Sequence, residues 1–475
     1  MNKIVWNLKK LNYRDLVIFL IPSIIFMYYL YVFNPGVLTY DSFDQLSQIA
    51  YHNFGTWHPF FHTFIEMLCL KIYPDPKSIC ILQILTFSTI WMIICKYNRN
   101  DEVKTKNFIA QVIITLIISL IPINAIYSIT LWKDILFSYF LLFSCFLIEV
   151  IVDRKGDVSY LFIAVLALTM VFICQLRPNG IIIILVLLIA LAFYFFKKNR
   201  DSKLYILLPV LTIIFILLIS SLNVAYEVKD NQKDAVFDKT THILAYYDLN
   251  VNVSNDDKMK IHEMISEKDI KEQFNIYYTD NTFHVSNESV FDADKSSYIK
   301  LVIKYSLKNP LKFLEYAFQS SNIVYDITRD HEWIGYVYTI EVEKNRDGFY
   351  EKSKKDPKYS YNNVSSKNAG NPEFKNLKSF AYSIEENIVS DTLLDSPALY
   401  MYLAFVLLGA LYFITRLKGL FLIYLPCLSN IFTIAVSTPY QANRYLYPNL
   451  LVFYLLVIIL IKLLCYKGNE GEIIT

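Results

Sequence analysis

The sequence predicts a polytopic α-helical membrane protein of about ten transmembrane helices with a small extracytoplasmic domain. Of its 475 residues, 55% are apolar, a share that makes an ordinary soluble enzyme a poor fit. A bilayer core requires roughly 20 apolar residues per helix, and ten segments approach that length. The predicted spans are 16–34, 79–95, 108–126, 134–152, 159–176, 180–196, 204–222, 397–415, 419–436 and 449–466.

The orientation of the spans follows from the basic residues of the short loops. With the N-terminus inside the cell, the cytoplasmic segments hold 17 Lys and Arg residues and the short outside loops hold 5. Basic residues concentrate on the cytoplasmic side of membrane proteins. We therefore predict a multi-pass protein of the cell membrane with both termini in the cytoplasm. Basic residues precede the first span and no small-residue cleavage site follows it, so this span is predicted to be a retained signal anchor.

The chain divides into three predicted parts. An N-terminal module of seven spans covers 1–222, a soluble extracytoplasmic domain covers 223–395, and a C-terminal module of three spans covers 396–475. Within the domain, Asn309 followed by Pro310 predicts the meeting point of two amphipathic helices. The stretch 340–378, rich in Lys, Asn, Ser and Tyr, is predicted to be a mobile loop.

The first outside loop, 35–78, is too long to be a simple connector. The spacing of apolar residues predicts two short helices, at 41–51 and 60–72, that lie against the membrane surface. None of the seven cysteines forms a two-residue-spaced pair, and six of them fall in apolar segments, so no disulfide framework is expected. Cys69 is predicted to be exposed. The net charge of +2 gives no indication of nucleic-acid binding.

Candidate catalytic residues lie in this first loop. Asp41 follows the first span closely, where a carboxylate could accept a proton from a sugar hydroxyl, although Asp is also a favoured helix N-cap. Asp44 is a second polar contact or a surface charge. His58, between Trp57 and Pro59, is a donor to a substrate or a structural histidine. The spacing of the histidines matches no known metal pattern, and metal ligation is the least favoured of the three interpretations of His58.

A second set of candidates ends the other outside connections. Charged residues at a membrane boundary are costly and are usually retained for function. Cations there suit an anionic lipid-linked phosphate, with headgroup anchoring by the basic residues and helix capping by the aspartate as the alternatives. The predicted phosphate- or substrate-binding residues are Lys133, Asp134, Arg177, Gln441, Arg444 and Tyr445.

This arrangement resembles the GT-C superfamily of membrane glycosyltransferases, and within it bacterial proteins similar to the dolichyl-phosphate-mannose protein mannosyltransferase type. The resemblance implies transfer of a sugar from a polyprenyl-phosphate donor to a cell-envelope glycan or a protein. It also implies that Asp41 is a base or positions the acceptor, and that Arg177 and Arg444 hold the donor phosphate. Many members carry an Asp-x-Asp pair, whereas two residues separate Asp41 from Asp44, which leaves the use of a divalent cation open.

Two other classes of function share some of these features. A lipid-linked polysaccharide polymerase would also present outside arginines, and a flippase-like transporter would show charged residues within its spans. A non-enzymatic scaffold would use 223–395 to bind a partner. The nearly uninterrupted apolar spans argue against transport, and the charged span ends argue against a scaffold.

Overall fold

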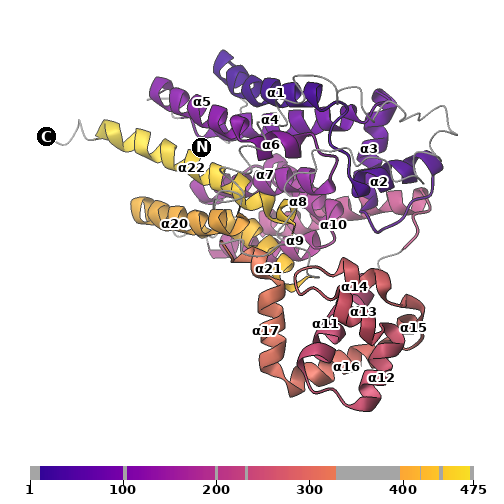
Figure 1. Ribbon diagram of the computed structural model, residues 1–475. Helices are drawn as coiled ribbons and strands as arrows, with labels where there is room; N and C mark the ends of the chain where they lie inside the picture. Colours follow the sequence, from indigo (N-terminus) through magenta and orange to yellow (C-terminus); the bar gives the residue numbers. More distant parts are fainter. Residues whose placement is uncertain are drawn as a thin grey trace.

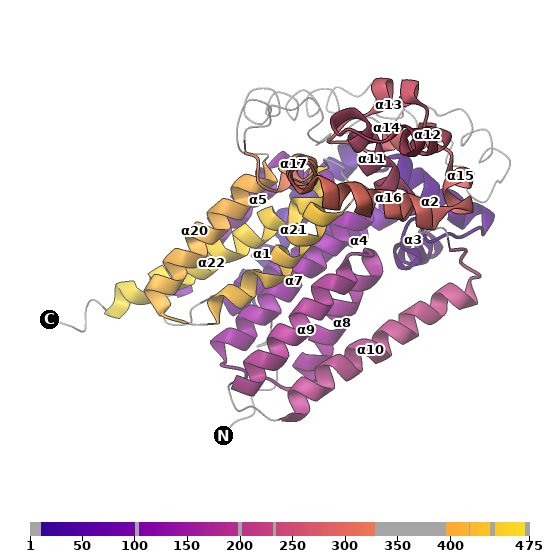
Figure 2. The same ribbon diagram turned by 90° about the horizontal axis from the view of Figure 1, so that it is seen from below.

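The computed structural model describes residues 11–99, 104–197, 202–230, 234–327, 396–417, 419–437 and 442–470. These residues form helices and three isolated β-bridges, without a β-sheet. Most helices run side by side in one bundle, and a smaller group of helices lies against it (Figures 1 and 2). The predicted mobile loop at 340–378 lies outside the described residues.

The bundle identifies the chain as a multi-pass helical membrane protein. Seven described helices are long and apolar enough to cross a membrane, and an eighth crosses if one bent pair is a single span. Two shorter apolar helices, Tyr160–Leu176 and Leu420–Val436, occupy the positions of two further predicted spans. The bundle helices are α1 (Tyr13–Val32), α4 (Lys77–Tyr97), α5 (Lys104–Leu120), α6 (Pro122–Ser128), α7 (Lys133–Asp153), α8 (Tyr160–Leu176), α9 (Gly180–Lys197), α10 (Ser202–Ala225), α20 (Pro397–Thr415), η6 (Leu420–Tyr424), α21 (Leu425–Val436) and α22 (Tyr447–Glu470).

The bent pair is α5 and α6, which meet at an angle of 70°. Pro122 opens α6, where its missing N–H cannot continue the hydrogen bonds of α5. The sequence predicts one continuous span over 108–126, whereas the structure bends this segment sharply at Pro122. After α6 the chain runs extended beside the first loop, with Val37 N donating to Ile129 O at 2.8 Å and Leu131 N donating to Val37 O at 3.1 Å. The bend therefore brings the start of α7 next to the loop that carries Asp41.

Helix α7 is the centre of the bundle. It packs against α4, α8, α21 and α22, and 94% of its most apolar stretch of 18 residues is buried. Its 21 residues span about 31 Å at 1.5 Å per residue. Charged residues at the Lys133 end and at the Asp153 end of the bundle are therefore far apart.

The first loop forms the two predicted short helices, α2 (Tyr40–Tyr51) and α3 (Phe60–Ile72). Helix α3 packs against α4, α8 and α10 as well as α2. Phe61, for example, contacts Phe172 of α8 at a ring-centroid distance of 5.3 Å. The prediction that Cys69 is exposed is therefore wrong, because these contacts bury it.

The smaller group of helices has a hydrophobic cluster of its own, built largely from tyrosine, phenylalanine and isoleucine. The predicted meeting of two helices at Pro310 is confirmed, since α16 ends at Lys308 and α17 begins at Pro310. The segment that follows α10 is tied to the first loop by a parallel bridge between Gly55 and Lys229. The helices of the smaller group are α11 (Asp234–Asn250), α12 (Asn255–Met264), α13 (Glu267–Gln273), α14 (Asp280–Val285), α15 (Glu288–Ala293), α16 (Lys295–Lys308) and α17 (Pro310–Ser320), followed by the 3₁₀ turn η1 (Asn322–Val324).

Candidate functional site

The start of α2 is fastened to the start of α7 by side-chain hydrogen bonds. Thr39, the N-cap of α2, donates its backbone N–H to Ser42 Oγ at 3.1 Å, and Ser42 Oγ donates to Leu131 O at 2.8 Å. Trp132 Nε1 donates to Thr39 Oγ1 at 2.7 Å. Thr39 and Ser42 thus occupy the capping positions, so Asp41 is not the cap that its sequence position allowed.

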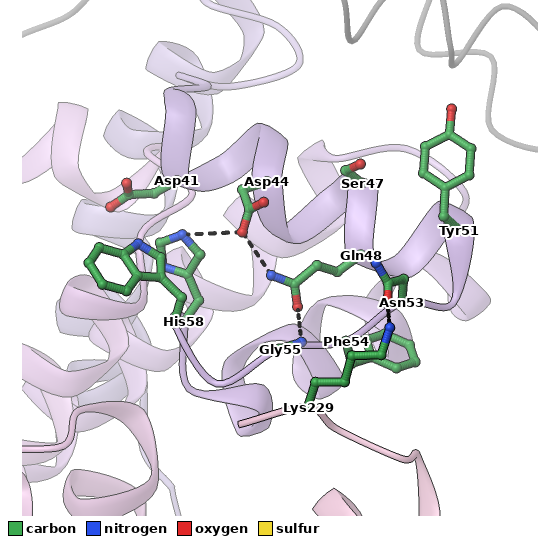
Figure 3. A pocket seen from close by; sticks show the side chains of 11 residues that line it. Asp41, Asp44, Ser47, Gln48, Tyr51, Asn53, Phe54, Gly55, His58 and Lys229 are labelled. Carbon is green, nitrogen blue, oxygen red and sulfur yellow. Dashed lines mark hydrogen bonds and ion pairs between the residues drawn. The ribbon is translucent and has the colours of Figure 1, made fainter. Parts of the chain in front are cut away.

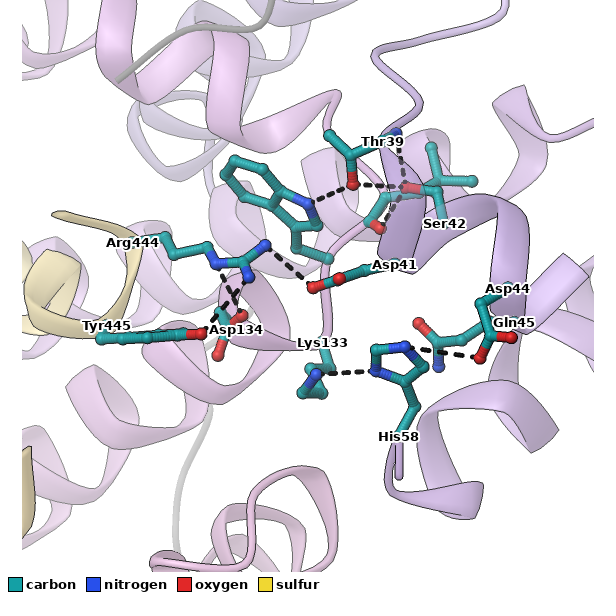
Figure 4. Close-up of polar contacts among 12 residues, drawn as sticks. Thr39, Asp41, Ser42, Asp44, Gln45, His58, Lys133, Asp134, Arg444 and Tyr445 are labelled. Carbon is teal, nitrogen blue, oxygen red and sulfur yellow. Dashed lines mark hydrogen bonds and ion pairs between the residues drawn. The ribbon is translucent and has the colours of Figure 1, made fainter. Parts of the chain in front are cut away.

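The carboxylate of Asp41 instead takes part in a buried network of ion pairs. Its Oδ2 lies 2.9 Å from Arg444 Nη1, and Arg444 Nε lies 3.6 Å from Asp134 Oδ2. Asp134 also pairs with Arg177, whose Nη1 is 3.1 Å from Oδ1. Figure 4 shows Arg444 between the two aspartates. Four elements therefore meet here: the first loop, the start of α7, the end of α8, and the 3₁₀ turn η7 (Asn443–Leu446) that leads into α22.

Aromatic rings hold the two guanidinium groups in place. Arg444 lies over the Trp132 ring, with its Cζ 4.5 Å from the ring centroid. Arg177 lies over the Tyr445 ring at 4.3 Å. Such cation–π contacts favour a guanidinium that is withdrawn from water. Both arginines are almost fully buried, so neither extends outward as a headgroup anchor.

A second polar chain runs from Lys133 through His58 to Asp44. Lys133 Nζ donates to His58 Nδ1 at 2.9 Å, and His58 Nε2 lies 3.4 Å from Asp44 Oδ2. Asp44 Oδ2 accepts from Gln48 Nε2 at 2.7 Å, and Gln48 Oε1 accepts from Gly55 N at 3.1 Å. Lys133 is therefore turned into the site rather than toward lipid headgroups.

The surroundings move the pKa values of these groups in different directions. Burial raises the pKa of Asp41, but the charges of Arg444 and Lys133 lower it well below its usual range. Burial and the neighbouring Asp41 raise the pKa of Asp44, against the opposing effects of Gln48 and Lys133. Burial and Lys133 lower the pKa of His58 to about 3. At neutral pH His58 is an uncharged imidazole that accepts at Nδ1 and offers its Nε2 proton to Asp44.

These side chains border a cavity of about 480 Å³ (Figure 3). Asp41, Asp44 and His58 lie along the same cavity as the aromatic rings of Tyr51, Phe54 and Trp57, the amides of Gln48 and Asn53, and Lys229. Lys229 Nζ donates to Asn53 Oδ1 at 2.8 Å. A cavity with carboxylates, amides and aromatic rings on its walls has the chemistry to bind a polyhydroxylated ligand.

A fully buried polar group lies behind this wall, on the side of α3. Gln45 Nε2 lies 3.0 Å from His62 Nδ1 and donates to Thr63 Oγ1 at 3.0 Å. His62 Nδ1 is also 3.5 Å from Glu66 Oε1. Burial raises the pKa of Glu66 well above its usual value and lowers that of His62 to about 3. His62 is therefore uncharged at neutral pH, and Gln45 joins α2 to α3 beneath the candidate catalytic residues.

The sequence-predicted residues converge at this one end of the bundle. Eight of the nine predicted site residues lie in the network around Arg444 and Arg177 or in the chain from Lys133 to Asp44. The ninth, Gln441, lies outside the described residues. Sequence reasoning missed Lys229, Gln48 and Asn53, whose only signal was a basic or amide side chain in an outside segment. It also missed the role of Trp132 as a platform for Arg444. Among the described residues, no group of three or more His, Cys, Asp or Glu side chains is placed to hold a metal.

Comparison of the chain with protein-family models, with curated proteins and with solved structures finds no match. Asp41, Asp44 and Asp134 face Lys133, Arg177 and Arg444, and Lys229 adds a fourth basic side chain at the cavity. Lys133 differs from the two arginines, because no carboxylate of the described residues lies within 4.0 Å of its Nζ. An anion could therefore bind to Lys133 without breaking an ion pair among the described residues.

Proposed function

We propose that this protein is a membrane glycosyltransferase of the GT-C type, which moves a sugar from a polyprenyl-phosphate donor to a cell-envelope glycan or a protein. The observation that carries the proposal is the position of Asp41. Its carboxylate borders a polar, aromatic-lined cavity and is held by Arg444, within a cluster that also contains Lys133 and Arg177. A base, a cationic phosphate site and a sugar-sized cavity are the three parts that such a transfer requires.

In the proposed reaction, Asp41 takes the proton of an acceptor hydroxyl as that oxygen bonds to the anomeric carbon. The bond between this carbon and the phosphate oxygen breaks, and its electron pair leaves with the polyprenyl phosphate. Lys133, with Arg177 and Arg444 behind it, stabilises the negative charge of the leaving phosphate. Asp44 and Lys133 hold His58 in one tautomer, so that its ring presents a fixed edge to the cavity.

The lowered pKa of Asp41 shapes this mechanism. A carboxylate held by Arg444 is a weak base in the empty protein. A donor phosphate that draws Arg444 toward itself weakens this ion pair and makes Asp41 more basic. Donor binding would therefore prepare Asp41 for proton transfer, and acceptor binding without donor would be unproductive.

The test uses purified protein in lipid nanodiscs, a panel of polyprenyl-phosphate monosaccharides and a cell-envelope extract as acceptor. We expect release of polyprenyl phosphate with at least one donor, coupled to sugar on the acceptor. A polymerase has the same need for arginines beside a lipid phosphate, so lipid-diphosphate-linked oligosaccharides are tested in parallel. Turnover of these alone would indicate a polymerase, and turnover of neither would favour a scaffold.

The proposal includes ten spans, both termini in the cytoplasm and the site outside the cell. The 17-to-5 distribution of basic residues supports this orientation. Reporter fusions at Gly156 and Gly370 should give opposite locations, with Gly370 outside. A cytoplasmic signal at Gly370 would contradict the orientation and the extracytoplasmic site with it.

A further inference from the structure

Helix α17 carries an uncovered apolar face. Leu311, Leu314 and Phe318 lie at helical spacing and are 79%, 61% and 62% exposed. On the opposite side of the helix, Tyr316 packs into the hydrophobic cluster of the small helical group, and Ser320 is also buried. Three large apolar side chains in a row on one face of a surface helix indicate a contact with another apolar phase.

The direction of α17 differs from that of the spans. In Figure 1 it crosses the direction of α20 and α22, and in Figure 2 it is seen nearly end-on while these helices are seen along their length. It packs against α21 of the bundle. A helix placed across the spans runs along the membrane plane rather than through it.

The apolar face continues directly onto the outer surface of a span. Phe318 stacks on Tyr325 with ring centroids 4.2 Å apart, and Tyr402 Oη donates to Tyr325 O at 3.0 Å. Tyr402 is 40% exposed on α20, on the side that also exposes Val406. Immediately after α17, Ile323 and Val324 of η1 enter the core of the bundle. The stripe on α17 is thus the edge of the same apolar surface that α20 presents to lipid.

We propose that α17 is an in-plane membrane helix whose Leu311, Leu314 and Phe318 face is immersed in the lipid of the adjacent leaflet. Lys308 and Lys312 flank this face, as basic residues do in interfacial helices, where they contact lipid headgroups. The proposal does not depend on the glycosyltransferase activity, because it rests on exposure, direction and continuity with a span.

Immersion of α17 would hold the small helical group at a fixed depth. This group contacts the candidate site through Phe283 of α14, which stacks on the cavity residue Trp57 with ring centroids 6.4 Å apart. The membrane would thereby fix the position of one cavity wall. A lipid-anchored domain beside the cavity also suits a ligand that arrives from the bilayer.

The experiment is spin-label accessibility in nanodiscs of phosphatidylethanolamine and phosphatidylglycerol. Single cysteines replace Leu311, Leu314 and Phe318, with Lys312→Cys on the same helix as a headgroup-level control and Glu267→Cys on α13 as a water-facing control. Collision with lipid-soluble oxygen and with a water-soluble nickel chelate is measured for each label. We expect the oxygen-to-nickel ratio to rise several-fold at the three apolar positions relative to both controls.

Two results would overturn the proposal. Nickel accessibility at Leu314→Cys equal to that at Glu267→Cys would place this face in water. Low accessibility to both reagents would show that protein covers it, either from a second copy or from another segment of this chain. The unsubstituted chain measures background labelling, which Cys174 and Cys465 would dominate because the other five cysteines are buried. Thermal unfolding of each variant separates a change of position from a loss of fold.

Discussion

Replacement of Asp41 by Asn tests the catalytic assignment with little disturbance of the fold. Asn has nearly the shape of Asp but lacks its charge and its basicity. The cap of α2 is formed by Thr39 and Ser42 and is unaffected. Arg444 retains Asp134 at 3.6 Å and the Trp132 ring. Since the Asp41 side chain is 25% exposed, we expect a stability loss of about 1 kcal/mol.

The expected effect on the rate is much larger. A positioned base contributes roughly 10²- to 10⁴-fold, which corresponds to about 2.7–5.4 kcal/mol of transition-state stabilisation at 1.36 kcal/mol per tenfold. The assay measures initial rates of polyprenyl-phosphate release in nanodiscs, with unfolding temperatures recorded on the same samples. A rate loss of at least tenfold, in a variant whose unfolding temperature is little changed, would be specific to the chemical step.

Asp44→Asn is the matched control. Asp44 lies on the same helix and the same cavity, but it is 51% exposed and contacts Gln48 and His58 rather than an arginine. We expect a loss of roughly tenfold or less, through the orientation of His58. Full activity in Asp41→Asn would refute the assignment of Asp41 and make His58 the next candidate. A larger loss in Asp44→Asn than in Asp41→Asn would assign the base to Asp44, whose raised pKa suits that role.

Three further predictions concern the phosphate site, pH and packing. Lys133→Met should weaken binding of decaprenyl phosphate about 10- to 100-fold in a nanodisc titration, since it removes one charge-assisted contact; unchanged affinity would assign the phosphate to the arginines. His58 and His62 have pKa values lowered to about 3 in the folded protein. In the unfolded chain both histidines bind a proton below about pH 6.5, whereas in the folded protein they stay neutral until about pH 3. Stability should be full above about pH 6.5 and fall as pH decreases, by about 1.4 kcal/mol per histidine at pH 5.5; unfolding temperatures at pH 7.5 and 5.5 measure this, and His58→Gln should reduce the drop. Gly36→Ala should destabilise the protein strongly, because Gly36 has φ +123° and an added Cβ would lie 2.8 Å from Ile129 O. Gly409→Ala is the control: its Cβ would meet no atom within 4 Å, so it should be neutral or stabilising. Equal unfolding temperatures for the two variants would contradict this prediction.

The local structure of the first loop was predictable because its signals are local. Thr39 precedes a polar–apolar helical pattern, and Pro59 begins a second one, so α2 and α3 appear within one residue of their predicted starts. The meeting of α16 and α17 at Pro310 follows from the same kind of signal. Each depends on backbone chemistry within a few residues, which a sequence displays directly.

Contacts between distant segments were not predictable in the same way. Lys133 and Asp134 are neighbours in sequence, yet the 100° turn between them directs one to His58 and the other to Arg177. The burial of Cys69 depends on packing of α3 against α4, α8 and α10, which its own residues do not reveal. The candidate list was therefore obtained from exposure and charge, while the pairing that distinguishes Lys133 from the arginines required the structure.

Charged residues alone do not identify the site, because the other end of the bundle contains a comparable set. There Asp15, fully buried, pairs with Arg99 at 2.8 Å and Lys96 at 3.3 Å, and Lys462 pairs with Asp153 at 2.7 Å. These pairs join α1, α4, α7 and α22, as buried ion pairs do when they fix the register of packed helices. The Asp41 end has two features in addition: a cavity of about 480 Å³ beside the carboxylates, and Lys133 facing a neutral histidine in place of a carboxylate. A cluster that serves only to pack helices needs neither, since a withdrawn cation without a directly paired carboxylate costs stability and an open cavity adds no packing contacts. That cost is the physical reason for assigning ligand binding to this end of the bundle.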